Sequence, residues 1–195
     1  ITADNTDFTS VTFDNTASTA VFAAGDPATK GFRVGDVVRF RVDEQNAERV
    51  RAVLRTFLDQ AASNPVVSAS ANEMLTRSGL QASSPSWDKA SVLQDWLNNR
   101  MGTIPDPDGI EKITSPDELF TSWFRAESQG NPLSVGEDCD GKAVALAAAL
   151  ISVGIPAQVV LYDVNGDGFL DHAAVTADID GRPVYAETVA PGLTL

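Results

Sequence analysis

The sequence has very few of the residues that form disulfides or bind transition metals. Its 195 residues include one cysteine, Cys139, and one histidine, His172. A lone cysteine cannot form a disulfide within the chain, and one cysteine with one histidine falls short of the ligand set of a structural zinc site. These absences exclude a disulfide-rich scaffold and a zinc finger, and they leave the cellular compartment open.

Basic residues are also scarce. The chain has 14 Lys and Arg residues against 27 Asp and Glu residues, which gives a formal net charge of -13 at pH 7. Proteins that bind nucleic acid normally carry a basic surface, so this balance argues against a nucleic-acid partner and against anionic membranes. The acidic residues are scattered along the chain, and we interpret them as a contribution to solubility.

Long apolar segments are lacking as well. The longest apolar run, residues 143–151, is much shorter than the roughly 18 residues that a membrane-spanning helix needs. Residues 1–10 are polar and acidic, so no signal peptide is visible and we expect a trimmed chain, with an extracellular or virion-associated location left open. The composition, with 43% hydrophobic and 21% charged residues, is that of a globular protein with one main domain.

The apolar pattern predicts strands first, then helices, then strands again. Residues 1–42 read as a β extension, and residues 38–42 alternate apolar and basic side chains. Helical spacing predicts helices over residues 43–62 and 66–78, after Pro85, from Ser115, and over residues 140–153. Strands are expected at residues 157–162, 171–177 and 183–189. This order predicts an α+β fold, with an extension at 1–42 and a cysteine-containing domain at 43–195.

Between the helices, the sequence gives finer expectations. Residues 101–115 are rich in proline and glycine and are expected to form a loop. Ser115 and Glu118 have the spacing of a capping box, which is typical of a helix N-terminus. The three tryptophans fall at helical spacing and are expected in the core, namely Trp87, Trp96 and Trp123.

Cys139 is expected at the start of the Ala-rich helix. The first-turn backbone N–H groups of a helix lack partners within the helix, and the helix dipole is positive there. Both effects favour the thiolate, lower the pKa of the cysteine, and offer hydrogen bonds to a developing oxyanion. The alternative is a buried and inert thiol, which is the common state of a lone cysteine.

His172 and Glu187 are expected on one face of a hairpin. If Asp180 and Gly181 form its two-residue turn, the pairing places Glu187 diagonally across from His172, roughly 7 Å away at the backbone. The carboxylate then reaches the imidazole and fixes its tautomer. The alternatives are an exposed histidine and an exposed glutamate, or a register slip by one residue that separates the two faces.

Four short motifs together resemble a known family. They run in the order Gly136-Glu-Asp-Cys139-Asp-Gly-Lys-Ala143, Gly154-Ile-Pro-Ala157, Asp171-His172-Ala173 and Tyr185-Ala-Glu187-Thr188. This arrangement looks like the signature of the transglutaminase-like superfamily, the circularly permuted relatives of papain. The segment from Asp138 to Ala143 is similar to that of the bacterial, archaeal and phage members known as transglutaminase-like cysteine proteinases, and the resemblance covers about residues 115–190.

The resemblance implies a papain/transglutaminase-like core and a cysteine peptidase or amidase. Cys139 would be the nucleophile, His172 the base, and Glu187 the acid that orients the base. A peptide or isopeptide amide would be cleaved or exchanged through a thioester, which water hydrolyses or an amine captures. No cofactor is required for this chemistry, and the partner would be a protein or peptide substrate.

The sequence departs from the family pattern in three places. The third member of the triad is usually Asp, whereas this chain has Glu187. An aromatic residue commonly follows His-Ala, whereas this chain has Ala174. The side chain that completes the oxyanion hole usually precedes the cysteine, and its candidates are Gln129, Asn131 and Trp123, of which we take Gln129 as the site residue.

A second motif indicates calcium. Residues 163–171 match the first nine positions of an EF-hand-type loop, with oxygen ligands at Asp163, Asn165, Asp167 and Asp171. Position 12 is Ala174, so the usual bidentate acid is missing, and strands are expected on both sides. The alternative is a turn rich in Asp, Asn and Gly.

Two other functions stay open beside the enzyme. The chain could be a non-catalytic structural or binding component of a virion or cell-surface assembly, which keeps the fold and meets an assembly partner through residues 1–42. Calcium binding could also be the main function, in which case Cys139 would be dispensable. Reaction of Cys139 with iodoacetamide near pH 6 distinguishes a reactive thiolate from a structural thiol.

Overall fold

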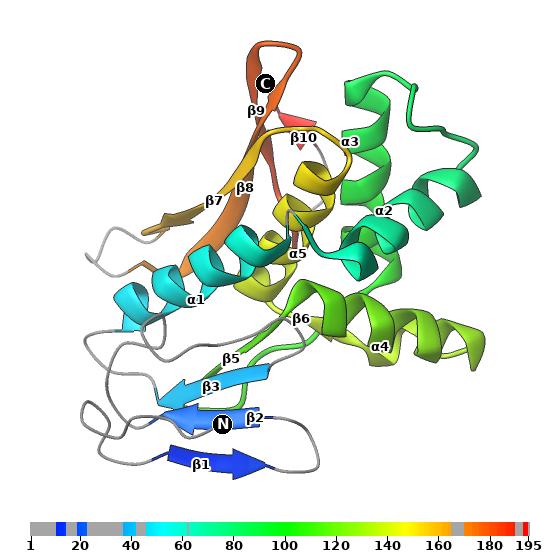
Figure 1. Cartoon of the computed structure of the whole chain (residues 1–195). Coiled ribbons are helices and arrows are strands. Elements are labelled where there is room, and N and C mark those ends of the chain that lie inside the picture. Colours follow the sequence, from blue (N-terminus) through cyan, green and yellow to red (C-terminus); the bar gives the residue numbers. More distant parts are fainter. Residues whose placement is uncertain are drawn as a thin grey trace.

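Helices and small sheets alternate along the chain in the computed structural model, which describes residues 11–14, 19–22, 37–41, 46–61, 63–164, 170–189 and 193–194. The combination confirms the α+β class (Figure 1). The papain-like core stays a prediction. Among the described helices, none is both long and apolar enough to cross a bilayer.

The first sheet joins the N-terminal strands to the helical part of the chain. As expected, residues 1–42 contain strands, which are β1 (Val11–Asp14), β2 (Thr19–Phe22) and β3 (Val37–Arg41). The sheet order is β1-β2-β3-β5, and β5 (Ile110–Thr114) pairs antiparallel with β3. A strand from the helical region therefore completes the sheet of the extension, while the domain boundary at residue 42 stays a prediction.

The prediction of a loop at residues 101–115 was wrong. This segment holds β4 (Gly102–Thr103) as well as β5. Of the residues that suggested a loop, Gly102 lies in β4, while Pro105, Pro107 and Gly109 lie between the two strands. The partner of β5 is β3, about seventy residues earlier in the chain, in a register that pairs Val38 with Ile113. A strand with so distant a partner leaves little local signal, because strand preference depends on packing against neighbours.

The helices follow the predicted apolar stripes. They are α1 (Asn46–Ala61), α2 (Pro65–Arg77), α3 (Ser86–Asp95), α4 (Pro116–Ser128) and α5 (Cys139–Ser152). A π-helical turn, η3 (Trp96–Arg100), continues α3, and a short 3-10 helix, η4 (Pro132–Ser134), follows α4. Trp96 and Trp123 are buried and pack edge to face at 5.1 Å, but Trp87 is 39% exposed, so its placement in the core was wrong.

The expected capping box predicted the right helix start, but its hydrogen bonds differ from those of a capping box. α4 begins at Pro116, directly after Ser115. The Ser115 hydroxyl donates to the Asp117 carboxylate at 2.7 Å instead of accepting from a helix amide, and Glu118 accepts from the Ser122 hydroxyl at 2.8 Å instead of reaching back. Nearby side chains, two and four residues away, thus bond the groups that a capping box would use.

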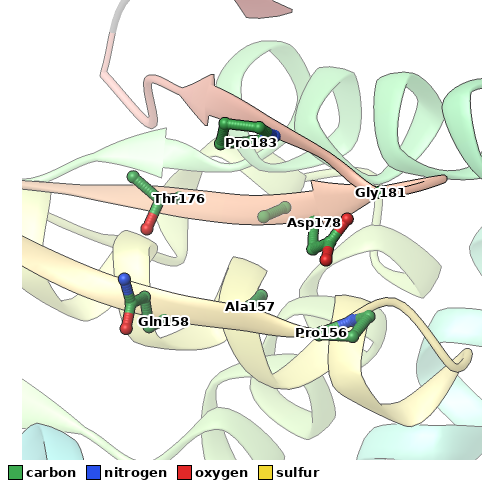
Figure 2. A pocket seen from close by; sticks show the side chains of 8 residues that line it. Pro156, Ala157, Gln158, Thr176, Asp178, Gly181 and Pro183 are labelled. Atoms are coloured by element: carbon green, nitrogen blue, oxygen red, sulfur yellow. The ribbon is translucent and has the colours of Figure 1, made fainter.

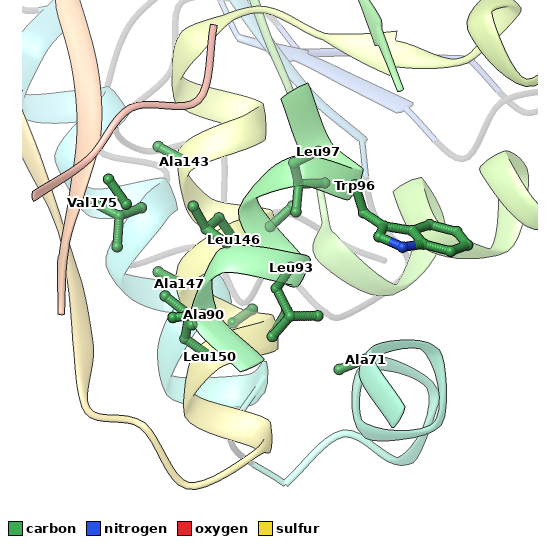
Figure 3. Packing of buried hydrophobic residues seen from close by; sticks show 14 of the residues in the cluster. Ala71, Ala90, Leu93, Trp96, Leu97, Ala143, Leu146, Ala147, Leu150 and Val175 are labelled. Atoms are coloured by element: carbon green, nitrogen blue, oxygen red, sulfur yellow. The ribbon is translucent and has the colours of Figure 1, made fainter. Parts of the chain in front are cut away.

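The Ala-rich helix α5 forms the centre of the core. Residues 140–150 of this helix are all buried. Figure 3 shows its small side chains against two neighbouring elements, with Ala143, Leu146, Ala147 and Leu150 near Ala90, Leu93 and Val175. Small side chains let α5 approach both helices and sheet closely, so its first residue is held in a fixed position.

The second sheet carries the hairpin that was expected. Its order is β10-β9-β8-β7, from β7 (Ala157–Tyr162), β8 (His172–Ile179), β9 (Arg182–Ala186) and β10 (Leu193–Thr194). β8 pairs with β9 from Ile179 opposite Arg182, as predicted. Asp180 and Gly181 have φ of 55° and 80°, the left-handed conformation that a type I′ turn requires.

Candidate active site

Close backbone contacts fix the start of α5, where Cys139 is the first helical residue. β6 (Gly136–Glu137) leads into the helix and pairs in parallel with β4. A Cβ on Gly136 would lie 1.9 Å from the carbonyl oxygen of Gly102. Only glycine allows this approach, and any side chain at position 136 would displace the segment that leads to the cysteine.

Lys142 ties the first turn of α5 to β4 from inside the protein. Its side chain is fully buried, and its ammonium group donates to the Thr103 hydroxyl at 2.8 Å and the Met101 carbonyl at 3.3 Å. Burial lowers the pKa of Lys142 to about 8. These hydrogen bonds compensate the buried amine and hold the helix start in register with β4.

Cys139 lies against the start of β8 and the end of β9. The backbone N–H of Ala173, the residue after His172, donates to the half-buried thiol. The Thr188 hydroxyl donates to the Cys139 carbonyl at 3.3 Å. The helix start is thus held by the neighbours of both other candidate residues, Ala173 on β8 and Thr188 just after β9.

His172 and Glu187 meet as the hairpin register predicted. The distance from His172 Nε2 to Glu187 Oε2 is 2.9 Å, and the two side chains are 20% and 16% exposed. With Glu187 ionised, Nε2 carries the proton of a neutral imidazole, and Nδ1 is the nitrogen that accepts. Tyr162 stacks beside the ring at 6.4 Å between centroids and limits its rotation.

Glu187 is held in its ionised form by a full set of donors. Besides His172, the Tyr185 hydroxyl donates to Oε2 at 3.0 Å, and the backbone N–H groups of Thr188 and Val189 donate to Oε1 at 2.7 and 3.2 Å. Burial acts to raise the pKa of Glu187, but these hydrogen bonds outweigh it, and the pKa lies below its usual value. The carboxylate is therefore charged and fixed beside the imidazole at neutral pH.

Sequence reasoning missed three side chains around Glu187. Tyr185 could have been found, because residues two apart on a strand share a face. Gln94 and Asn98 donate to the main-chain carbonyl of Glu187 at 2.8 and 3.1 Å. They come from α3 and η3, about ninety residues away, and nothing in the local pattern indicates that contact.

The expected lowering of the Cys139 pKa was wrong. Burial and the charge of Asp138 raise the pKa of the thiol to about 11, with Glu111 adding to the effect, while the N–H groups of Ala173 and Cys139 itself act in the opposite direction. The helix start does supply donors, but burial and the neighbouring carboxylates together outweigh them. The resting side chain is thus a thiol at neutral pH.

A group of carboxylates lies around Asp138, the residue directly before Cys139. Oxygens of Asp106, Glu111 and Asp138 lie within 4.8 Å of one another, from the loop after β4, from β5 and from the residue before α5. Burial and the charge of Asp138 raise the pKa of Asp106 to about 7. Burial and hydrogen bonds to Asp138 and Glu111 raise the pKa of Asp140. Close carboxylates of this kind keep a proton or attract a cation.

The two acidic groups differ as candidate cation sites. In the cluster, Asp106 Oδ1 and Asp138 Oδ1 are buried and make no hydrogen bond among the described residues. In the loop that resembles a calcium site, Asp171 accepts a hydrogen bond from the Val164 N–H at 2.9 Å, while Asn165 and Asp167 lie outside the described residues. Calcium binding by Asp163, Asn165, Asp167 and Asp171 stays a prediction.

The oxyanion candidates fall at three different places. Trp123 is buried, and its indole N–H donates to the Arg100 carbonyl at 2.8 Å, so it has no proton to offer a substrate. Asn131 is exposed just before η4. Gln129 is exposed at the C-terminal cap of α4, and within the described residues no hydrogen bond joins it to Cys139. Its role in the oxyanion hole stays a prediction.

A pocket of about 300 Å³ lies at the other end of the sheet. Figure 2 shows it between β7, β8 and the hairpin turn, with Gln158, Thr176, Asp178 and Pro183 among its lining residues. Neither Cys139 nor His172 lines it. This pocket is therefore separate from the candidate active site.

Comparisons with known proteins give little further information. No family model and no curated protein matches the sequence. One solved structure, described as a “putative protease” from Parabacteroides distasonis, is similar to 73% of this chain at 19% identity, with a TM-score of 0.44. The matched part is 27% of that protein's length.

Proposed function

We propose that this chain is a cysteine hydrolase or acyltransferase of the transglutaminase-like type. It would cleave or exchange a peptide or isopeptide amide through a thioester on Cys139. The observation that supports the proposal is the 2.9 Å contact between His172 and an ionised Glu187. This contact lies next to Ala173, whose backbone N–H donates to the thiol of Cys139, the only cysteine in the sequence. A nucleophile, a base and an acid that orients the base are the groups used in thiol acyl transfer by a catalytic triad.

In the first half of the reaction, the Cys139 sulfur attacks the amide carbonyl while His172 accepts the thiol proton. Glu187 stabilises the resulting imidazolium through Nε2. The tetrahedral oxyanion receives hydrogen bonds from N–H groups at the first turn of α5. The C–N bond then breaks, and the amine leaves with the proton from His172, so a thioester remains on Cys139.

In the second half, His172 takes a proton from water, whose oxygen attacks the thioester. The C–S bond breaks, the carboxylic acid leaves, and the sulfur regains its proton. An amine that replaces water gives a new amide by the same steps. Because the pKa of Cys139 is about 11, proton transfer to His172 accompanies attack instead of preceding it.

The proposal is tested on the intact protein by peptide cleavage and by alkylation. Cys139→Ala should abolish cleavage of a mixed peptide library, measured by mass spectrometry, with folding retained by circular dichroism. Since Cys139 is the only cysteine, iodoacetamide reports on it alone. His172→Ala should slow alkylation at pH 7 by about 100-fold, the usual lower range for a general base.

A matched control is Asp178→Asn, which changes an exposed acid on the same strand. It should leave both cleavage and alkylation unchanged. Equal alkylation of His172→Ala and the unchanged protein would refute the pairing of thiol and imidazole.

A second candidate function is supported by the raised pKa of Cys139. A partly buried thiol with a pKa of about 11 is typical of a structural cysteine. On this reading the chain is a non-catalytic component that keeps the fold and binds an assembly partner through residues 1–42. Slow alkylation near pH 6 that does not depend on His172 would favour it over the enzyme.

A further inference from the structure

We propose that Gln94 and Asn98 are positioning residues for Glu187, and that the π-helical turn η3 exists to present them. This inference rests on the proposed function, because it concerns how the acid behind His172 is held. Gln94 Nε2 and Asn98 Nδ2 both donate to the Glu187 carbonyl oxygen, at 2.8 and 3.1 Å. Both hydrogen bonds go to the main chain of Glu187, so on this proposal each residue acts through Glu187.

Glu187 needs such support because it lies just beyond the strand ladder. β9 ends at Ala186, and its pairing with β8 ends where Ala186 faces Val175. The carbonyl of Glu187 therefore receives no ladder hydrogen bond from β8. Two side-chain amides take that place, and a shift of this main chain would move the carboxylate away from His172.

The two amides are brought to one point by helix geometry. Residues four apart lie on the same helix face, and Gln94 lies in the last turn of α3 while Asn98 lies inside η3. π-helical turns are rare and occur frequently at functional sites. Here the wider turn faces the end of β9 directly after the last regular turn of α3.

The turn itself is rigidly anchored on its other sides. Trp96 and Leu97 are buried in the core, and the Arg100 guanidinium lies over the Trp96 ring at 4.5 Å. The Trp123 indole N–H donates to the Arg100 carbonyl at 2.8 Å. These contacts make η3 a fixed platform from which Asn98 reaches the acid.

The burial of Gln94 supports the same conclusion. Its side chain is 4% exposed, and an amide in that position destabilises the fold unless it is hydrogen-bonded. An apolar side chain of equal size would fill the space without that requirement. Unlike an apolar side chain, the Gln94 amide donates a hydrogen bond to the Glu187 carbonyl.

The test measures alkylation of Cys139 by iodoacetamide in the full chain between pH 5 and 9. Asn98→Leu keeps the number and branching of the side-chain heavy atoms and removes the donor, and we expect about a tenfold slower reaction at pH 7. The pH of half-maximal rate should also fall, because a displaced carboxylate stabilises the protonated imidazole less. Asn99→Leu is the matched control, since Asn99 lies next in the same turn but donates to the exposed Asp95 carboxylate at 2.6 Å.

A double-mutant comparison separates positioning from a general structural effect. If Asn98 acts through Glu187, Asn98→Leu should change nothing further in a Glu187→Ala background. Gln94→Met, which keeps the side-chain volume, serves as the second variant should Asn98→Leu melt early. Unchanged alkylation in both variants would overturn the inference, as would an undiminished effect in the Glu187→Ala background.

Failure of the inference differs from failure of the proposed function. If Glu187→Ala slows alkylation but Asn98→Leu and Gln94→Met do not, only the positioning role is lost. If His172→Ala and Glu187→Ala both react like the unchanged protein, the catalytic pairing and this inference are lost together.

Discussion

The two sides of Cys139 are built in opposite ways. On the side of the hairpin, the carboxylate of Glu187 is ionised, hydrogen-bonded at both oxygens, and has a lowered pKa. On the side of β5, carboxylates face one another, two of their buried oxygens make no hydrogen bond among the described residues, and the pKa of Asp106 is raised to about 7. One side is organised to orient an imidazole, and the other places negative charge against the thiol.

Because the two sides of Cys139 carry such different charges, the position of a cysteine at a helix start does not by itself decide its reactivity. Donors from Ala173 and from the first turn favour the thiolate, yet burial and Asp138 raise the pKa of Cys139 to about 11. In the proposed function, the reactivity of Cys139 then depends on His172 and Glu187, and on whether the negative charge on the other side is neutralised.

The largest effect is expected from a substitution on the hairpin side. Glu187→Gln removes the charge but keeps the size, so the imidazolium loses its partner and the ring can take the wrong tautomer. We expect alkylation and any cleavage to fall by about 50-fold at pH 7, somewhat less than for His172→Ala, because the base itself remains. Stopped-flow alkylation followed by intact mass measures this, with Asp178→Asn as control. A fall of less than threefold would contradict the role of Glu187.

The hairpin side could be predicted from the sequence because its residues lie close together along the chain. Asp180 and Gly181 form a turn that fixes the register locally, so the meeting of His172 and Glu187 was visible in the sequence. The Ala-rich helix and its start at Cys139 were visible for the same reason, because helix periodicity and caps are local signals.

The other side could not be predicted, because its residues come together only through distant pairing. Glu111 lies on β5, whose partner β3 belongs to the N-terminal sheet, and Asp106 lies in the loop before it. The segment was expected to be a loop, so neither acid was placed near Asp138. Burial and Asp138 are the main causes of the raised pKa of Cys139, and the missed strand adds the smaller contribution of Glu111.

The second prediction asks whether a cation completes the acidic side. Three carboxylates within 4.8 Å should take Ca²⁺ as hard oxygen ligands. At 100 times its Kd, Ca²⁺ should stabilise the fold by about 2.7 kcal/mol, or roughly 5–10 °C in Tm, measured by differential scanning fluorimetry against a chelator.

Two variants show which acidic group is responsible. Asp106→Asn should abolish the Tm shift if the cluster binds Ca²⁺, whereas Asp163→Asn should abolish it if the loop at residues 163–171 does. A shift that survives in both variants, or no shift in the unchanged protein, would contradict calcium binding at either place.

Removing negative charge from the acidic side should make Cys139 more reactive. Asp138→Asn removes the charge that, after burial, raises the pKa of Cys139 most. About 1 kcal/mol of relief corresponds to roughly a fivefold faster alkylation at pH 7. Asparagine remains a good N-cap residue, so stability should change little. Asp108→Asn, an exposed acid in the neighbouring loop, is the control, and a slower reaction of Asp138→Asn would contradict this account.

The smallest effect is the pH dependence of stability, which has opposite signs on the two sides. The pKa of Glu187 is lowered in the fold, so its stabilisation is present at neutral pH and is lost as pH falls. The pKa of Asp106 is raised from 3.8 to about 7, so its neutral form stabilises the fold below about pH 4, and that contribution is lost as pH rises through 7. Asp106→Asn should remove the second dependence only.

Relative to the unchanged protein, Asp106→Asn should therefore gain about 1 kcal/mol between pH 5 and pH 8, once solvent screening of this half-buried group is allowed for. That gain is roughly 2–4 °C in Tm, measured by thermal unfolding in a chelator so that no cation occupies the cluster. Asp108→Asn should show no such trend. A parallel pH dependence of Asp106→Asn and the unchanged protein would mean that Asp106 is ionised in the fold, and the two sides of the cysteine would then differ in hydrogen bonding but not in charge.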